Sequence, residues 1–384
     1  MKPKLRFKNF NDNWITCTIK DVADVVGGGT PDTSNPKLWN GSINWFTPSE
    51  IGKSKYISNS ERKITELGVQ KSSAKLLPIG TILLSSRATV GEASILQNNQ
   101  ACTNQGFQSL IAHKNINNEF LYYLKDKYKK NMLNKAFGST FLEISKSNIE
   151  KIKINIPTIE EQTKISNFLS LLDKKIELQS KKIEDLKLFK KGLFNMIFNE
   201  VDGKDYLLSD VVLFENGKGH ENIVDDNGEY VLINSKFIST EGNVIKKCTE
   251  QLTPLYKNDI TMVMSDLPNG KALAKCYYIE DDNKYSLNQR ICRIQVKDNN
   301  IINSKYLYYL LNRNPYYLKF DDGVNQTNLK KDDILNINIL LPSIDIQEEN
   351  SKILTIMDNL IDRESNKLSK LYSLKKGLMQ SMFV

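Results

Sequence analysis

Residues 157–200 read PTIEEQTKISNFLSLLDKKIELQSKKIEDLKLFKKGLFNMIFNE, and the spacing of their apolar residues indicates the architecture of the chain. Ten positions from Ile165 to Ile197 are spaced alternately by four and three residues, and eight of them are apolar. This heptad spacing predicts one long helix with an apolar edge that packs against a partner helix. The alternative is that the helix packs only on its own domain, but about 40 residues would run about 60 Å and overshoot a domain.

The same pattern returns 185 residues later, from Asn350 to Met382, with seven of ten positions apolar. The chain therefore supplies the partner helix itself. Other residues matched at this spacing are Ile154-Asn-Ile-Pro157 with Ile339-Leu-Leu-Pro342, Gln162 with Gln347, Asp173 with Asp358, and Lys190-Lys-Gly-Leu193 with Lys375-Lys-Gly-Leu378. The predicted seam residues are Ile165, Leu169, Leu172, Ile176, Ile183, Leu186 and Leu193 in the first helix and Leu354, Met357, Ile361, Leu368, Leu371 and Leu378 in the second. Polar seam positions also recur, Gln179 with Glu364 and Lys190 with Lys375, and such residues can fix the register of two helices.

Weaker matches continue upstream of both helices and indicate a tandem duplication. They pair Ile19-Lys-Asp-Val22 with Leu208-Ser-Asp-Val211, Asn104-Gln105 with Asn288-Gln289, and Phe120-Leu-Tyr-Tyr-Leu124 with Tyr306-Leu-Tyr-Tyr-Leu310. We predict an α+β chain of four segments. A globular segment spans residues 1–156, a long helix 157–200, a second globular segment 201–341, and a second long helix 342–384. Apolar runs at 79–85 and 259–265 predict buried strands, while 120–130 and 305–312 are typical of helices.

The charge of the chain is unevenly distributed. The net charge is +8, but residues 1–156 hold 22 basic and 12 acidic side chains, whereas residues 201–341 hold 17 and 20. An excess of base in one segment is the footprint of a polyanion-binding protein. At 384 residues the chain is long enough for at least two hydrophobic cores.

Several classes of protein are not expected. No apolar run approaches the roughly 18–20 residues that span a bilayer, and the first residues lack the apolar core of a signal peptide. Five cysteines without a Cys-x-x-Cys pair, and only two histidines, do not predict a zinc site. Buried free thiols in a reducing cytoplasm are the expectation.

The search for catalytic residues is mostly negative. Gly27-Gly-Gly-Thr30 is not followed by the Gly-Lys-Ser/Thr of a phosphate-binding loop. Asp32, Glu61 and Lys63 have the loose spacing of a Mg²⁺-dependent nuclease, but Asp32 lies in a Gly/Pro-rich loop and the second copy lacks the pattern. We therefore expect no catalytic residue and no metal or cofactor bound to this chain, with the nuclease kept as an open alternative.

Polar residues on predicted loops remain as candidates for DNA binding. Asn and Gln can bond to adenine in the major groove and Arg or Lys to guanine, while Gly and Ser permit close approach of a phosphate backbone. Candidates come in parallel from both copies: Gly28, Gly29, Thr30, Trp45, Ser85, Arg87, Asn104, Gln105 and Ser139 from the first, and Gly217, Lys218, Ser265, Asn288, Gln289, Arg290, Asn325, Gln326 and Thr327 from the second.

The chain as a whole resembles the specificity (S) subunits of type I restriction-modification systems. Gly28-Gly-Thr-Pro31, followed by Trp39-Asn-Gly41 and Ile43-Asn-Trp45, is similar to the start of that family's first target-recognition domain. Pro157-Thr-Ile-Glu-Glu-Gln162, continued by Ile165, Phe168-Leu169 and Leu172-Asp173, is similar to its central repeat. The second repeat departs from this pattern, with Ile346 in place of Glu161 and Asn350 in place of Ile165.

The resemblance implies a non-catalytic protein in which each recognition domain reads one half of a bipartite target in double-stranded DNA. It implies that two antiparallel helices set the spacer between the half-sites. It further implies docking of modification subunits, which use S-adenosylmethionine to methylate adenine, and of restriction subunits, which use ATP and Mg²⁺. The alternative is a duplicated coiled-coil scaffold that recruits partners without sequence-specific DNA binding.

Overall fold

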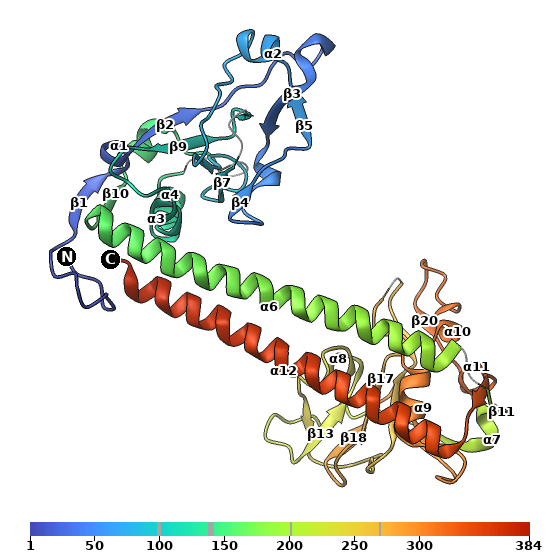
Figure 1. Ribbon diagram of the computed structural model, residues 1–384. Coiled ribbons are helices and arrows are strands. Elements are labelled where there is room, and N and C mark those ends of the chain that lie inside the picture. Colours follow the sequence, from blue (N-terminus) through green and yellow to red (C-terminus); the bar gives the residue numbers. More distant parts are fainter. Residues whose placement is uncertain (98–100, 137–141, 200–201, 269) are drawn as a thin grey trace. The chain divides into compact units, whose positions relative to one another are not determined.

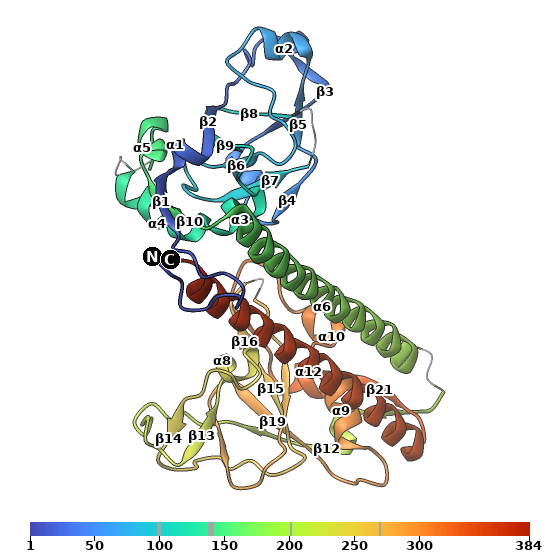
Figure 2. The same ribbon diagram turned by 60° about the vertical axis from the view of Figure 1, so that its left-hand side comes forward.

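The computed structural model describes residues 1–97, 101–136, 142–199, 202–268 and 270–384 (Figures 1 and 2). The chain divides into two compact units. Unit 1 contains Met1–Ser180 and Asn366–Val384, and unit 2 contains Lys181–Ser365. Each unit therefore combines a globular part with the beginning of one long helix and the end of the other.

The globular part of unit 1 is built on a five-stranded sheet of order β2-β9-β6-β7-β4. A second sheet has the order β5-β3-β8, and β1 pairs with β10. The strands are β1 (Ile15–Thr18), β2 (Ala23–Gly27), β3 (Trp39–Phe46), β4 (Tyr56–Ile57), β5 (Arg62–Ile64), β6 (Ile82–Leu84), β7 (Ala93–Leu96), β8 (Ala101–Thr103), β9 (Gln108–Ala112) and β10 (Lys153–Ile156). The helices are α1 (Ile19–Val22), α2 (Glu66–Gln70), α3 (Asn118–Tyr123), α4 (Lys125–Lys135) and α5 (Lys146–Glu150), with 3-10 turns at Pro36–Leu38 and Pro48–Glu50.

Unit 2 has a four-stranded sheet of order β12-β19-β15-β17 and a three-stranded sheet of order β14-β13-β18. Two strand pairs, β11 with β21 and β16 with β20, complete it. The strands are β11 (Lys204–Leu207), β12 (Val212–Asn216), β13 (Tyr230–Ile233), β14 (Lys247–Cys248), β15 (Ile260–Val263), β16 (Ser265–Asp266), β17 (Cys276–Tyr278), β18 (Tyr285–Leu287), β19 (Ile291–Val296), β20 (Thr327–Asn328) and β21 (Asn338–Leu341). The helices are α7 (Leu208–Val211), α8 (Ser235–Ser239), α9 (Ser304–Leu311), α10 (Pro315–Leu318) and α11 (Lys331–Leu335).

The two globular parts have the same topology, which confirms the predicted duplication. In unit 1, β3 pairs antiparallel with β5 and parallel with β8. In unit 2, β13 pairs antiparallel with β14 and parallel with β18. The larger sheets also correspond strand for strand, except that unit 1 adds β4 beyond β7 while β17 of unit 2 is an edge strand.

The long helices are α6 (Ile159–Asn199) and α12 (Ile344–Met382). In unit 1, Asp173 near the start of α6 pairs with Lys375 near the end of α12, with 2.5 Å between Oδ1 and Nζ. In unit 2, Lys190 near the end of α6 pairs with Asp358 near the start of α12. The helices therefore pack antiparallel, as predicted, and the alternative that each packs only on its own domain is wrong.

The apolar seam is distinct from the other helix faces. All thirteen predicted seam side chains are buried or half-buried, whereas Leu171, Leu178 and Leu188 outside the seam are exposed. The helix ends also contact the cores. The rings of Phe383 and Phe120 lie 5.4 Å apart in unit 1, and those of Phe198 and Tyr306 lie 5.0 Å apart in unit 2.

Shorter elements differ from prediction in their boundaries. The helix predicted over 120–130 is two helices, α3 and α4, that meet at Leu124. The strand predicted over 79–85 is limited to β6, because Gly80 turns the chain with a φ of +82°. Within the described residues, no helix has the length and apolar content that crossing a bilayer requires.

Candidate nucleic-acid interface

The parallel pairing of β3 with β8 brings the first set of candidates together in unit 1. Phe46 at the end of β3 lies opposite Thr103 at the end of β8. The next residue, Asn104, donates its backbone N–H to the carbonyl of Phe46 at 3.0 Å. The loop that starts at Asn104 therefore projects from the ends of two paired strands, a rigid base for a binding loop.

The glycine loop after β2 lies directly against Asn104. Gly29 donates its N–H to the carbonyl of Thr103 at 2.8 Å, and the hydroxyl of Thr30 bonds to the side-chain oxygen of Gln105. A Cβ on Gly28 would stand 2.0 Å from the Asn104 carbonyl oxygen, a distance that no side chain tolerates. Glycine is thus required here for close backbone approach.

Trp45 is buried beneath this loop and is hydrogen-bonded to its backbone. Its indole N–H donates to the carbonyl of Gly29 at 2.8 Å, and the residue is only 3% exposed. Trp39 packs edge-on against it at 5.0 Å, and the guanidinium of Arg62 lies 3.8 Å from the centre of the Trp39 ring. Trp45 therefore positions the loop and has no free face with which to contact a base.

Ser85 and Arg87 border the same loop on its other side. The neighbouring Ser86 donates its N–H to the carbonyl of Gly106 at 2.8 Å. Ser85 is buried and its hydroxyl donates to the Arg87 carbonyl at 2.7 Å. The exposed Arg87 guanidinium pairs with Glu143 at 2.7 Å. Ser139 lies outside the described residues.

Unit 2 assembles its candidates in the same way. Asn288 follows β18 and donates its N–H to the carbonyl of Ile233 at 3.1 Å, as Asn104 does to Phe46. Gln289 donates its N–H to the carbonyl of Lys218 at 2.9 Å. A Cβ on Gly217 would lie 2.0 Å from the Asn288 carbonyl oxygen, the same clash as at Gly28.

The other candidates of unit 2 adjoin this loop. The carbonyl of Arg290 accepts from the N–H of Met264 at 2.9 Å. The side-chain amide of Gln326 donates to the hydroxyl of the buried Ser265 at 2.7 Å. Thr327 is buried opposite Asp266, while Asn325 is exposed.

The structure fixes how Ser85-Ser86-Arg87 of unit 1 and Ser265-Asp266 of unit 2 correspond. The backbone of Arg87 pairs antiparallel with that of Glu143, and the backbone of Ser265 pairs antiparallel with that of Asn328. Ser86 donates its N–H to the Gly106 carbonyl, and Met264 donates its N–H to the Arg290 carbonyl in the same way. Ser265 therefore corresponds to Arg87. The sequence could not settle this, because the short runs contain no shared residue that fixes the offset.

Exposure separates the candidates into two roles. The exposed ones, able to meet a ligand directly, are Arg87, Gln105, Lys218, Gln289, Arg290, Asn325 and Gln326, with Gly28, Thr30, Asn104, Gly217 and Asn288 half-buried. Gly29, Trp45, Ser85, Ser265 and Thr327 are buried and hold the loops in place. Direct DNA contact stays a prediction for the exposed and half-buried residues. For the buried residues, direct contact is not supported, because their side chains are covered.

Three residues of the clusters were missed from the sequence. Glu221 bonds to the side-chain amide of Gln289, and Glu143 pairs with Arg87. The buried His220 bridges the Lys218 carbonyl, 2.8 Å from Nδ1, and the Ser286 hydroxyl, 2.7 Å from Nε2. Of these three residues, only His220 could have been singled out from the sequence, because the chain has just two histidines.

The nuclease alternative gains no support from the site. Asp32 accepts bonds from the N–H and hydroxyl of Ser34, at 2.9 and 2.7 Å, and these bonds lower the pKa of its carboxyl. In the part of the chain that the structure describes, no three or more His, Cys, Asp or Glu side chains are grouped to hold a metal ion. All five cysteines are free, and burial raises the pKa of Cys102 to about 11.

Units 1 and 2 therefore contain two copies of one α+β module, each with a polar loop cluster held on the ends of paired strands. The family profile described as the type I restriction modification DNA specificity domain matches residues 11–188 and again residues 200–372. The chain belongs to this family.

Individual relatives agree with the family match. The chain is 36% identical over 219 residues to the type I restriction enzyme MjaIX specificity subunit of Methanocaldococcus jannaschii, an alignment covering 54% of this chain and 50% of the relative. It is 30% identical over 197 residues to the EcoR124I/EcoR124II specificity subunit of Escherichia coli, covering 47% and 48%. The chain thus spans about half the length of these curated relatives.

A solved structure shows the same fold. The S subunit of a type I restriction-modification system from M. genitalium has a TM-score of 0.64 at 19% identity, covering 100% of this chain and 99% of that one.

Proposed function

We propose that this chain is the DNA specificity subunit of a type I restriction-modification enzyme, in which each polar loop cluster reads one half of a split target. The observation that carries the proposal is the equivalent placement of Asn104-Gln105 and Asn288-Gln289 in two copies of a family domain. Amide side chains can make paired hydrogen bonds to adenine in the major groove. Because the residues around the two loops differ, the two half-sites should differ in sequence. The family match does not support the alternative of a scaffold without DNA recognition.

The proposed partners follow from the same membership. Modification subunits would bring S-adenosylmethionine, and restriction subunits ATP and Mg²⁺, while this chain supplies recognition and spacing. One structural neighbour, at TM-score 0.61 and 15% identity, comes from work on complex assembly of the type I R-M system. The free thiols are in keeping with a reducing cytoplasm.

A DNA mobility-shift assay with the modification subunit present tests the proposal. We expect a retarded complex on duplexes that contain the target sequence identified from methylated adenines. Duplexes in which either half-site is scrambled should bind at least about tenfold more weakly, because each mismatched base pair loses contacts worth roughly 1–3 kcal/mol. Equal binding to both duplexes would favour the scaffold alternative.

A further inference from the structure

In unit 1, a strand of the same chain, β4, occupies the edge position next to β7 in the larger sheet. We call this edge position the slot. Strand β4 adds parallel to β7 at the sheet edge: Ile95 donates its N–H to the Lys55 carbonyl at 2.7 Å, and Gln97 to the Ile57 carbonyl at 2.9 Å. The Lys55 ammonium then reaches inward and bonds to Glu119 at 2.9 Å and to Ser170 at 2.6 Å. The slot therefore takes an extended segment that carries a charge opposite to that of Glu119.

Unit 2 has the same slot without the strand. Tyr278 of β17 lies opposite Ile260 as Ile95 of β7 lies opposite Ile82, so the two strands correspond. β17 is the edge of its sheet in the described part of unit 2. The Cys276 N–H of β17 is bonded to the Asn312 side-chain oxygen at 3.0 Å, so the position for an added strand lies at Tyr278, which matches Ile95. A sheet edge of this kind permits addition of a strand from another polypeptide.

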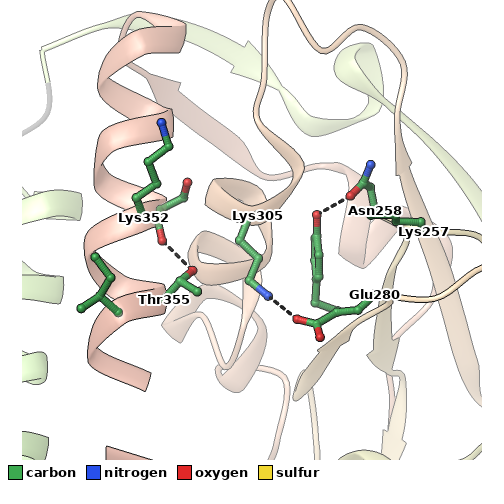
Figure 3. Close-up of a pocket in the computed structure, with 9 residues that line it drawn as sticks. Lys257, Asn258, Glu280, Lys305, Lys352 and Thr355 are labelled. Atoms are coloured by element: carbon green, nitrogen blue, oxygen red, sulfur yellow. Dashed lines mark hydrogen bonds and ion pairs between the residues drawn. The ribbon is translucent and has the colours of Figure 1, made fainter. Parts of the chain in front are cut away.

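A cavity of about 630 Å³ lies beside this edge, between β17 and helix α12 (Figure 3). Its lining includes three lysines, Lys257, Lys305 and Lys352, and one carboxylate, Glu280. In Figure 3, Lys305 extends between the helix that carries Lys352 and Thr355 and the strand side that carries Asn258 and Glu280. Ile356, 64% exposed, adds apolar surface.

The charge within the slot is inverted between the units. Lys305 corresponds to Glu119, because each lies two residues after an asparagine, Asn303 or Asn117, whose N–H donates to a matched glutamine of a long helix. Lys305 is bonded to Glu280 at 3.4 Å, a long contact to a side chain that is 75% exposed. Burial lowers the pKa of Lys305, an effect that Glu280 opposes. Glu280 and Asp358 both favour the charged ammonium, and a further anion beside it would add to that effect.

We propose that the edge of β17 and its adjoining cavity bind an extended acidic segment of another polypeptide, added as a strand parallel to β17 with a carboxylate on Lys305. A protein segment fits better than DNA, because the edge of a sheet presents backbone donors and acceptors with which an added strand can pair. This inference goes beyond the proposed reading of DNA and does not depend on it.

Fluorescence polarisation with the full chain tests the proposal. The probe is a labelled peptide of residues 52–60 carrying Lys53→Glu and Lys55→Glu, and the comparison peptide keeps both lysines. We expect the acidic peptide to bind at least about tenfold tighter. The Lys305→Glu variant, which reproduces the charge at Glu119, should reverse the preference, while Lys319→Glu at an exposed position outside the cavity should not.

Ile356→Glu provides a second variant with little risk to folding, since Ile356 is exposed, and it should weaken the acidic peptide at least about fivefold. A thermal melt confirms that each variant is folded. Failure of both peptides to bind, equal affinity for the two, or an unchanged preference in Lys305→Glu would overturn the proposal. So would a Lys305→Glu variant that loses affinity for random duplex DNA while its peptide preference stays the same, because the lysines would then belong to a nucleic-acid surface.

Discussion

At the scale of single residues, the two polar clusters depend on Gly28 and Gly217. Each glycine lets its loop pass within contact distance of the carbonyl of an asparagine that starts the opposite loop. The Gly-Gly-Thr motif was apparent from sequence, but its partner carbonyl was not, because that contact depends on the pairing of β3 with β8.

Substitution of Gly28 tests this packing. In Gly28→Ala, the new Cβ would meet the backbone oxygens of Asn104 and Thr103, at 2.0 and 2.4 Å, so the loops must separate. We expect the free energy of unfolding to fall by roughly 1–3 kcal/mol, measured by chemical denaturation. Gly192→Ala is the matched control: nothing lies within 4 Å of its Cβ, and alanine in a helix should raise stability by up to about 1 kcal/mol. A stable, DNA-competent Gly28→Ala would contradict the close approach.

Residue roles were harder to predict than residue proximity. The sequence identified loops that the structure does bring together, since the repeat itself marked them. It did not distinguish the exposed Gln105 from the buried Trp45, because burial at a strand end depends on which neighbours cover it. Arg62 on the Trp39 ring was equally invisible, since cation–π contacts have no sequence spacing.

At the scale of elements, the heptads predicted both long helices to within a few residues, because a 4-3 pattern sustained over about 40 residues has few alternatives. The short strands carried no such pattern. β4 has two residues, and only the partner β7 makes it a strand. The ion pairs between the helices were also missed, although Asp173, Lys190, Asp358 and Lys375 had all been matched between the copies.

The pair of Lys190 with Asp358 should fix the antiparallel register. Tyr309 also donates its hydroxyl to Asp358 at 2.8 Å, so this carboxylate joins both helices to α9. We expect Asp358→Lys to lower the free energy of unfolding by roughly 1–2 kcal/mol, and Lys190→Asp with Asp358→Lys to recover part of the loss. Denaturation of the single and double variants measures the coupling. If the loss of unfolding free energy in the double variant equals the sum of the losses in the two single variants, the pair is not coupled.

Helix length offers a second prediction. Seven residues inserted after Gln179, with seven more after Glu364 to keep the seams matched, would lengthen the pair by about 10 Å at 1.5 Å per residue. If the helices set the spacer, the preferred gap between half-sites should grow by about three base pairs. Binding to duplexes of graded gap length reports this, and an unchanged optimum would mean that the helices do not set the spacing.

At the scale of the whole molecule, the two copies share their strand topology but differ in the side chains and contacts at matched positions. Glu161, 1% exposed, accepts two bonds from the Arg6 guanidinium, both at 2.7 Å. Its counterpart Ile346 is 47% exposed. The apparent decay of the second repeat thus has a local cause in unit 1, where the amino-terminal segment supplies the arginine. Two like scaffolds with unlike contacts suit a protein that reads two different half-sites.

We propose that each unit reads its own half of one split target. Mapping of methylated adenines in the DNA of a host that expresses this chain with a modification subunit tests it most directly. We predict two different half-sites at a fixed gap, with Gln105→Ala relaxing one half only and Gln289→Ala the other only. Methylation at a single continuous site, or one variant altering both halves together, would contradict the account.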